Sequence, residues 1–186
     1  KLSGSFEDQQ ETFGDLILLL AMIIILVYIV MASQFESFMS PFVIMFSIPF
    51  AFVGVFMGLW VTGTPLGTMG MIGILILMGI VVKNGIVLID YTILMRERGK
   101  SVAEASVIAA KSRLRPILMT TLTTVLGMVP MAVGQGEGSE MWRSLGMVVA
   151  WGLSISTLVT LVIIPTVYAS MASWQERRAA RKAARA

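Results

Sequence analysis

Residues 16–32 read LILLLAMIIILVYIVMA, and none of them is charged. A helix needs about 20 apolar residues to cross the hydrocarbon core of a bilayer, which is about 30 Å thick. Hydrophobic residues make up 56% of the 186-residue chain and charged residues only 13%, about half the usual charged share of a soluble domain. No run alternates polar with apolar residues as a barrel strand would. The sequence therefore predicts an α-helical membrane protein.

On the C-terminal side of this run, four more stretches are long and apolar enough to span a membrane. The five predicted spans are 16–32, 41–60, 68–92, 116–133 and 145–171. The chain then consists of a polar N-terminal segment (1–15), a five-helix transmembrane region (16–171) and a basic tail (172–186). It begins with Lys1 rather than Met and has no polar stretch long enough to bury a core. We therefore expect it to be part of a larger protein.

Charges between the spans predict the orientation of the chain. Basic residues are concentrated in the 96–115 connection and in the tail, whereas the first 15 residues are acidic. Because positive charge collects on the cytoplasmic side, the C-terminus is expected in the cytoplasm and the N-terminus on the outer side. This topology accounts for the basic residues, so nucleic acid is not an expected partner. Ser101 and Glu104 form a capping-box pattern, which predicts a short amphipathic helix over 101–114 along the inner surface.

Composition excludes most enzyme chemistry. The sequence contains no Cys and no His, so it has no disulfide, no Cys- or His-based zinc site and no Ser/His or Cys/His catalytic pair. No other catalytic constellation replaces them, and the chain is not expected to be an enzyme or to bind a metal. Its 15 Met residues could conduct a soft ion such as Cu(I), but they are scattered through every span. Packing and lipid contact are the favoured interpretation of the methionines.

Two charged residues lie inside the third span. Lys83 is about 9–12 residues from the cytoplasmic end of the helix, which places it about 14–18 Å deep. A charged residue at that depth is a functional candidate by default. Asp90 follows seven residues later on nearly the same face, about 10.5 Å along the axis, too far for an ion pair. Asp90 is expected to be hydrated or to meet Arg96 or Arg113. Either Lys83 is neutral in its buried setting, or its partner belongs to another segment.

The neighbouring spans contain residues that bear on this site. The fourth span carries a threonine cluster whose hydroxyls either bond to their own helix or reach a neighbour: Thr120, Thr121, Thr123 and Thr124. Pro49 and Pro165 are expected to kink the second and fifth spans or to free a carbonyl. Glycines in the second and third spans predict close helix packing: Gly54, Gly58, Gly70, Gly73, Gly79 and Gly85.

Several ordered motifs resemble one transporter family. They are YIVMASQFESFMSPFVIMFSIPFAFVG, GTPLG, GIVVKNGIVLIDY, RLRPILMTTL and GMVPMAVGQGEGSE. Together they resemble the C-terminal membrane region of the resistance, nodulation and division transporters, in the hydrophobe and amphiphile efflux branch. The resemblance implies helices eight to twelve of a twelve-helix bundle, preceded by the last strand of a periplasmic porter domain near Gly4. Residues 1–15 would then be the periplasmic end of that porter segment.

The resemblance also implies a site and a mechanism. Lys83 matches the lysine and Thr120 the threonine of the family's proton relay, with Asn84 beside the lysine, Arg113 at the inner entrance and Asp90 as a weaker candidate. The relay's Asp pair would come from the first repeat, which this sequence does not contain. The implied activity is drug export driven by the proton-motive force, without a cofactor. Lys83 followed by Asn84 argues mildly against the heavy-metal branch.

The implied setting is the bacterial inner membrane. The expected partners are the first repeat, two further copies in a homotrimer, a periplasmic adaptor and an outer-membrane channel. Two alternatives stay open: a small membrane scaffold or regulatory subunit without transport, and a fragment of a metal-ion efflux pump. The substrate itself cannot be read from the chain.

Overall fold

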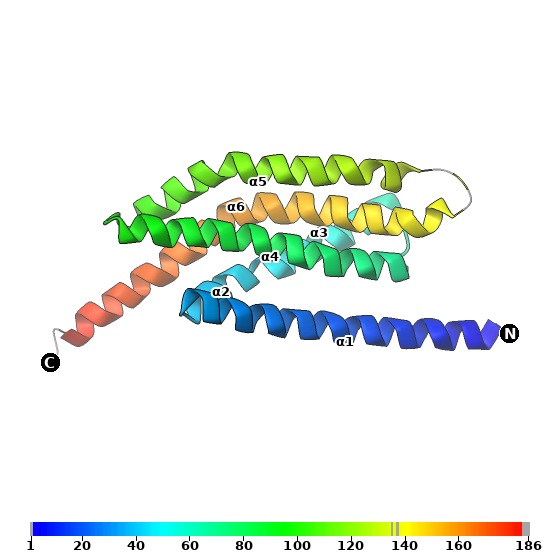
Figure 1. Ribbon diagram of the computed structural model, residues 1–186, viewed down its shortest axis with the longest axis horizontal. Helices are drawn as coiled ribbons and strands as arrows, with labels where there is room; N and C mark the ends of the chain where they lie inside the picture. Colours follow the sequence, from blue (N-terminus) through cyan, green and yellow to red (C-terminus); the bar gives the residue numbers. More distant parts are fainter. Residues whose placement is uncertain (1, 135, 137, 184–186) are drawn as a thin grey trace.

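The computed structural model contains six α-helices in the part of the chain that it describes (Figure 1). The backbone is described for residues 2–134, 136 and 138–183, and the side chains for residues 8–134, 136 and 138–174. The helices are α1 (Leu2–Phe35), α2 (Met39–Met45), α3 (Ser47–Thr62), α4 (Thr68–Glu97), α5 (Val102–Val133) and α6 (Ser139–Ala183). No strand occurs within these described ranges, so the predicted all-α fold is confirmed.

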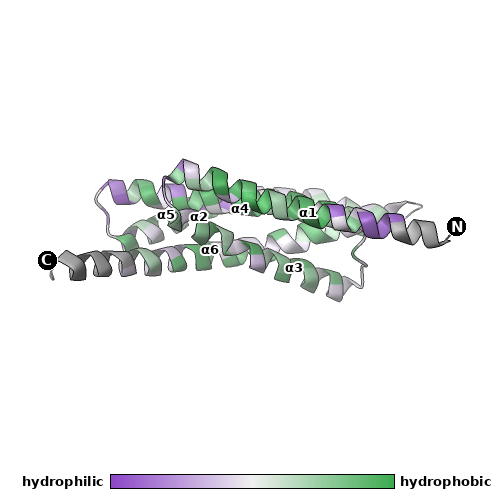
Figure 2. Ribbon diagram, turned by 90° about the horizontal axis from the view of Figure 1, so that it is seen from below, coloured by the Kyte–Doolittle hydropathy of each residue, from purple (hydrophilic) through white to green (hydrophobic). Residues whose placement is uncertain are grey.

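Five helical segments are long and apolar enough to cross a membrane, as the sequence predicts. They are Asp8–Phe35, Met39–Thr62, Thr68–Glu97, Val102–Val133 and Ser139–Trp174. Figure 2 shows hydrophobic residues along the middle of the bundle and hydrophilic ones gathered near its ends. Trp60, Trp142 and Trp174 are exposed near span ends, where tryptophans commonly lie at the membrane–water interface.

The first helix corrects the expected start of the chain. The sequence predicts a span beginning at Leu16, and the family resemblance implies a strand near Gly4, but α1 is helical from Leu2. The residues before Leu16 are rich in Glu and Gln and contain no Pro, so helix hydrogen bonding extends from the apolar run back through them. Thr12 adds to this local order by donating from its hydroxyl to the Asp8 carbonyl, 2.8 Å away.

The second predicted span is a broken helix. Helix α2 ends at Met45 and α3 begins at Ser47, with Phe46 between them. Pro49 has no N–H to donate to the Met45 carbonyl four residues earlier, which explains why the helix breaks here. At the break, the Ser47 hydroxyl donates to the Ile44 carbonyl at 2.7 Å. The kink expected at Pro49 is confirmed.

The predicted inner helix 101–114 is not a separate element, because α5 runs from Val102 through Pro116 to Val133. The capping box at its start is confirmed: the Glu104 N–H donates to the Ser101 hydroxyl, and the Ser101 N–H donates to the Glu104 carboxylate. Pro116 removes one helix hydrogen bond without ending the helix. Figure 1 shows that α5 bends in its N-terminal part, so this part leans on the bundle rather than lying apart from it.

Helix α6 is the centre of the bundle and packs against α3, α4 and α5 (Figure 1). Its side chains Val148, Val149 and Leu153 are fully buried. The expected close packing through glycines is present except at Gly79, where a Cβ would meet nothing within 4 Å, and its main partner is α6. Gly54 and Gly58 of α3 lie against the Trp151 region of α6, and Gly73 of α4 lies against Val148. Helix α6 also continues through the predicted tail to Ala183, although the side chains of residues 175–186, with Arg177, Arg178, Arg181, Lys182 and Arg185, lie outside the described part.

Candidate functional site

An uncovered stripe runs along α4 and carries both charged residues predicted for the site. Ile76, Gly79, Lys83, Asp90 and Leu94 are exposed and follow one another at spacings of three, four or seven residues. Such spacings place side chains on one helix face. The opposite face, with Leu77, Val81 and Leu88 among its buried side chains, packs into the core. The stripe is therefore the side of α4 that the other helices of this chain leave open.

Lys83 lies in the middle of this stripe. It is 15 residues after Thr68 and 14 before Glu97, which is about 21–23 Å from either end of the helix. Within the described side chains it makes no hydrogen bond and no ion pair. Gly79, one turn earlier, would carry a Cβ without meeting any atom within 4 Å. The structure therefore leaves space beside the Lys83 ammonium at the depth where a partner is needed.

The threonine cluster divides into two groups. Thr120, Thr123 and Thr124 each donate from the hydroxyl to a carbonyl of their own helix at 2.8–3.1 Å. Thr121 is different, because its hydroxyl is buried and lies 3.1 Å from the Thr157 hydroxyl on α6. The structure brings neither Thr120 nor the other threonines into a hydrogen bond with Lys83. The hydrogen bond between α5 and α6 through Thr157 was not predicted from the sequence. The signal that could have indicated it is the helical spacing of Ser154, Thr157 and Thr160 in the fifth span.

Arg113 and Arg96 both point to tyrosines and not to Asp90. The Arg113 guanidinium lies over the Tyr91 ring, 4.8 Å from its centroid, a cation–π geometry. Its Nε is buried without a hydrogen-bond partner among the described residues. Arg96 donates from Nη1 to the Tyr168 hydroxyl on α6 at 3.3 Å. Of the two settings expected for Asp90, a pairing with one of these arginines is not formed, and Asp90 stays exposed on the stripe.

The Thr121–Thr157 bond should contribute a small, measurable coupling between α5 and α6. We expect a double-mutant cycle of Thr121→Val and Thr157→Val to give a coupling of about 0.6 kcal/mol, and at most about 1.7, as is typical of interhelical hydrogen bonds in membranes. The measurement is reversible denaturation of the complete protein in mixed micelles. Thr123→Val with Thr157→Val is the matched control, because the Thr123 hydroxyl bonds only to its own helix. Equal couplings in the two cycles would contradict the assignment.

Fold and site together define a polytopic helical membrane protein with an uncovered charge at membrane depth. Comparison with known families gives the class a name: residues 1–172 match the model of the AcrB/AcrD/AcrF family. The chain belongs to this family of resistance, nodulation and division transporters, which are secondary transporters and not enzymes.

Three curated relatives illustrate the match. The chain is 41% identical to the swarming motility protein SwrC of Bacillus subtilis (strain 168), over 94% of this chain and 17% of SwrC. It is 36% identical to the multidrug resistance protein MdtC of Proteus mirabilis (strain HI4320), over 99% of this chain and 18% of MdtC. It is 35% identical to the cobalt-zinc-cadmium resistance protein CzcA of Cupriavidus metallidurans (strain ATCC 43123 / DSM 2839 / NBRC 102507 / CH34), over 89% of this chain and 16% of CzcA.

A solved structure shows the same arrangement of helices. The crystal structure of a heavy metal efflux pump (crystal form II) superimposes with a TM-score of 0.81 at 32% identity. The match covers 90% of this chain and 16% of that pump. The chain thus spans less than a fifth of the relatives it matches, and it corresponds to a membrane region of an efflux transporter.

Proposed function

We propose that this chain forms the membrane part of a proton-driven multidrug efflux pump and carries half of its proton-relay site. The observation that supports the proposal best is Lys83, which lies at mid-helix on the uncovered stripe of α4 with no partner among the described side chains. On insertion scales a charged residue at the bilayer centre costs about 2.5–3.5 kcal/mol. Another segment therefore has to cover the stripe and supply the opposite charge.

The covering segment proposed here is the first repeat of the transporter, with its pair of aspartates. The space over Gly79 allows a helix to approach α4 closely next to Lys83. When the aspartates are ionised, they hold the Lys83 ammonium as an ion pair. Protonation from the periplasm releases the lysine, and the helices shift to a second arrangement that drives export.

Thr120 can take part in this relay without giving up its present bond. Its hydroxyl donates to the Ile117 carbonyl at 2.9 Å, and the same oxygen retains lone pairs that can accept from an ammonium group. Asn84 is half-buried beside Lys83 and offers an amide to the covering segment. We place Arg113 at the inner entrance, with Asp90 as a weaker proton carrier on the same stripe.

The proposed substrate class is amphiphilic drugs. MdtC is named a multidrug resistance protein, whereas CzcA is named for cobalt, zinc and cadmium. The sequence has no Cys or His, and within the described ranges no three His, Cys, Asp or Glu side chains gather as a metal site would require. Buried methionines such as Met71 and Met78 are core residues. The pair Lys83 and Asn84, which in the resemblance argues mildly against the heavy-metal branch, supports the proposal of drug export.

The proposed setting is the bacterial inner membrane, with the N-terminus in the periplasm and the C-terminus in the cytoplasm. An odd number of spans supports ends on opposite sides of the membrane, and the start of α1 and the end of α6 lie at opposite ends of the bundle in Figure 1. The basic α4–α5 connection supports a cytoplasmic position for that end. We further propose a homotrimer that works with a periplasmic adaptor and an outer-membrane channel.

Transport by the complete protein tests this proposal. In proteoliposomes with an imposed proton gradient, we expect uptake or efflux of a fluorescent amphiphilic dye that stops when the gradient is collapsed by a protonophore. Cu(I) and Zn²⁺ flux measured in parallel should stay at the level of empty liposomes. Gradient-driven metal flux without dye flux would indicate a metal pump. No flux of either kind, with a normal effect on a partner pump in cells, would indicate a scaffold.

A further inference from the structure

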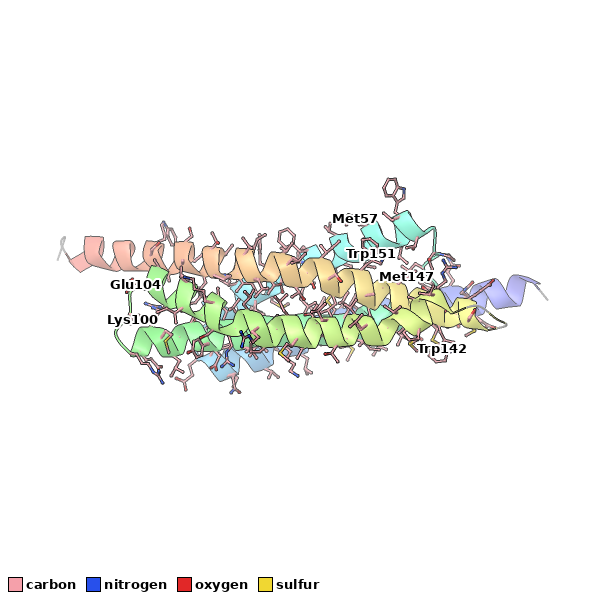
Figure 3. The ribbon with its side chains drawn as sticks, turned by 90° about the horizontal axis from the view of Figure 1, so that it is seen from above. Met57, Lys100, Glu104, Trp142, Met147 and Trp151 are labelled. Atoms are coloured by element: carbon pink, nitrogen blue, oxygen red, sulfur yellow. The ribbon has the colours of Figure 1, made fainter. Side chains whose placement is uncertain are left out.

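A groove lies between the N-terminal part of α5 and the second half of α6, apart from the Lys83 stripe. Its volume is about 490 Å³. The groove lies at the end of the bundle that carries Lys100 and Glu104. Figure 3 shows that Trp142 lies at the opposite end. Val107 on α5 and Val162 on α6 form parts of its exposed wall, while Ser106 and Pro165 are buried beneath.

The walls of this groove are mostly apolar and present no free hydroxyl proton, although two hydroxyl side chains line it. The Ser106 hydroxyl donates to the Val102 carbonyl at 2.8 Å, and the Thr166 hydroxyl donates to the Val162 carbonyl at 2.7 Å. Both protons are therefore used within their own helices. The complement of such a surface is hydrocarbon.

The groove continues into an apolar track along α6. Leu158 and Val162, one turn apart, are 64% and 67% exposed. Ala169, which lines the groove, follows Leu158 by 11 residues. This separation is about 16 Å along the helix axis. That length is close to half of the roughly 30 Å hydrocarbon core, which is one leaflet. An acyl chain fits this track from headgroup level toward the middle of the bilayer.

Lys111 gives the groove its charge. It lines the groove, is exposed, and makes no hydrogen bond or ion pair with the side chains described. Lys100 and Arg98 in the adjacent connection carry the same sign, whereas the nearby Glu104 is held in the capping box of α5. A ligand with an apolar tail and an anionic group is therefore complementary to both parts of the groove.

We propose that this groove binds one anionic phospholipid, with its acyl chain against Val162 and Leu158 and its phosphate at the Lys111 ammonium. Basic pockets between transmembrane helices at the cytoplasmic side bind anionic headgroups in this way. The flexible stem of a lysine lets its ammonium reach the headgroup level while its methylenes cover apolar surface. The proposal concerns a lipid site and does not depend on which substrate is exported.

Lipid retention by the complete transporter tests the proposal. The protein is placed in nanodiscs of mixed phosphatidylglycerol and phosphatidylethanolamine, and bound lipids are counted by native mass spectrometry. We expect selective retention of phosphatidylglycerol, reduced about fivefold by Lys111→Gln, as follows from the loss of one lysine near an anionic surface. Arg143→Gln, the matched control at the opposite end of α6, should retain as much phosphatidylglycerol as the unchanged protein.

A second variant tests the apolar half of the site. Val162→Trp fills the apolar track on α6 and should reduce retained phosphatidylglycerol even though Lys111 is present, while the elution volume shows that the protein is folded. Retention of phosphatidylethanolamine as strong as that of phosphatidylglycerol would overturn the proposal. Equal retention in the unchanged protein and in Lys111→Gln would overturn it as well.

Discussion

Replacing Lys83 with alanine in the complete transporter is expected to reduce drug resistance to the level of cells without the pump, at unchanged protein abundance. The reason is that, in the proposed relay, Lys83 is the cation at mid-depth on the uncovered face of α4 with which the aspartates of the first repeat would pair. Without it, protonation and deprotonation of those aspartates no longer change an ion pair. The measurement is the minimum inhibitory concentration of several drugs, together with quantitative immunoblotting of membranes.

Three further variants separate a relay from a general charge effect. Lys100→Gln removes a lysine from the α4–α5 connection and should leave resistance unchanged. Asp90→Asn changes the other charged residue of the stripe and should reduce resistance only partly, because Asp90 lies near the inner end of α4. Thr120→Ala should reduce it more strongly than Thr123→Ala. Full resistance in Lys83→Ala at normal abundance would rule out the relay.

Replacing Gly54 with valine is expected to destabilise the bundle by about 1–3 kcal/mol, the usual effect of overpacking a close contact. A Cβ at Gly54 would lie 3.0 Å from the Ile155 Cβ, 3.1 Å from the Gly152 Cα and 3.1 Å from the Trp151 carbonyl oxygen. Two of these atoms belong to the α6 backbone, which cannot rotate away as the end of a side chain can. The α3 and α6 helices would have to separate.

The measurement is the thermal unfolding midpoint of the purified transporter in detergent, supported by its abundance in membranes. Gly14→Val and Gly127→Val are the matched controls, because a Cβ at either glycine meets nothing within 4 Å. Both should unfold close to the unchanged protein. A Gly54→Val protein as stable as these controls would mean that α3 and α6 are not held at the separation seen here.

The sequence predicted local features well because each depends on the chemistry of a short segment. Hydropathy and length identified the five spans, because an apolar segment is stable in lipid only when its own helix satisfies the backbone hydrogen bonds. The capping box at Ser101 and the break before Pro49 follow from which backbone groups can donate or accept. The depth of Lys83 follows from counting residues along a helix. The motifs around Lys83 and Pro116 also identified the family that the comparison confirmed.

Other features depended on how the helices meet. From the sequence, α1 was expected to start at Leu16 and the inner helix to be separate, but hydrogen bonding continues through both junctions. The hydrogen bond between Thr121 and Thr157 depends on how α6 packs against α5. The hydrogen bond between Arg96 and Tyr168 depends on how α6 packs against α4. These are contacts between segments far apart in the chain, and single-segment patterns do not encode them.

What the sequence by itself determined is that this chain is a five-span helical membrane protein with a lysine at mid-membrane depth. What only the tertiary structure decided is that α6 is the central helix, that Gly54 and Gly73 face it, and that Lys83 faces outward on an uncovered stripe. The physical reason is that these helices are apolar on nearly every side. Hydropathy therefore shows that they enter the membrane, while shape and close packing choose which face meets which neighbour.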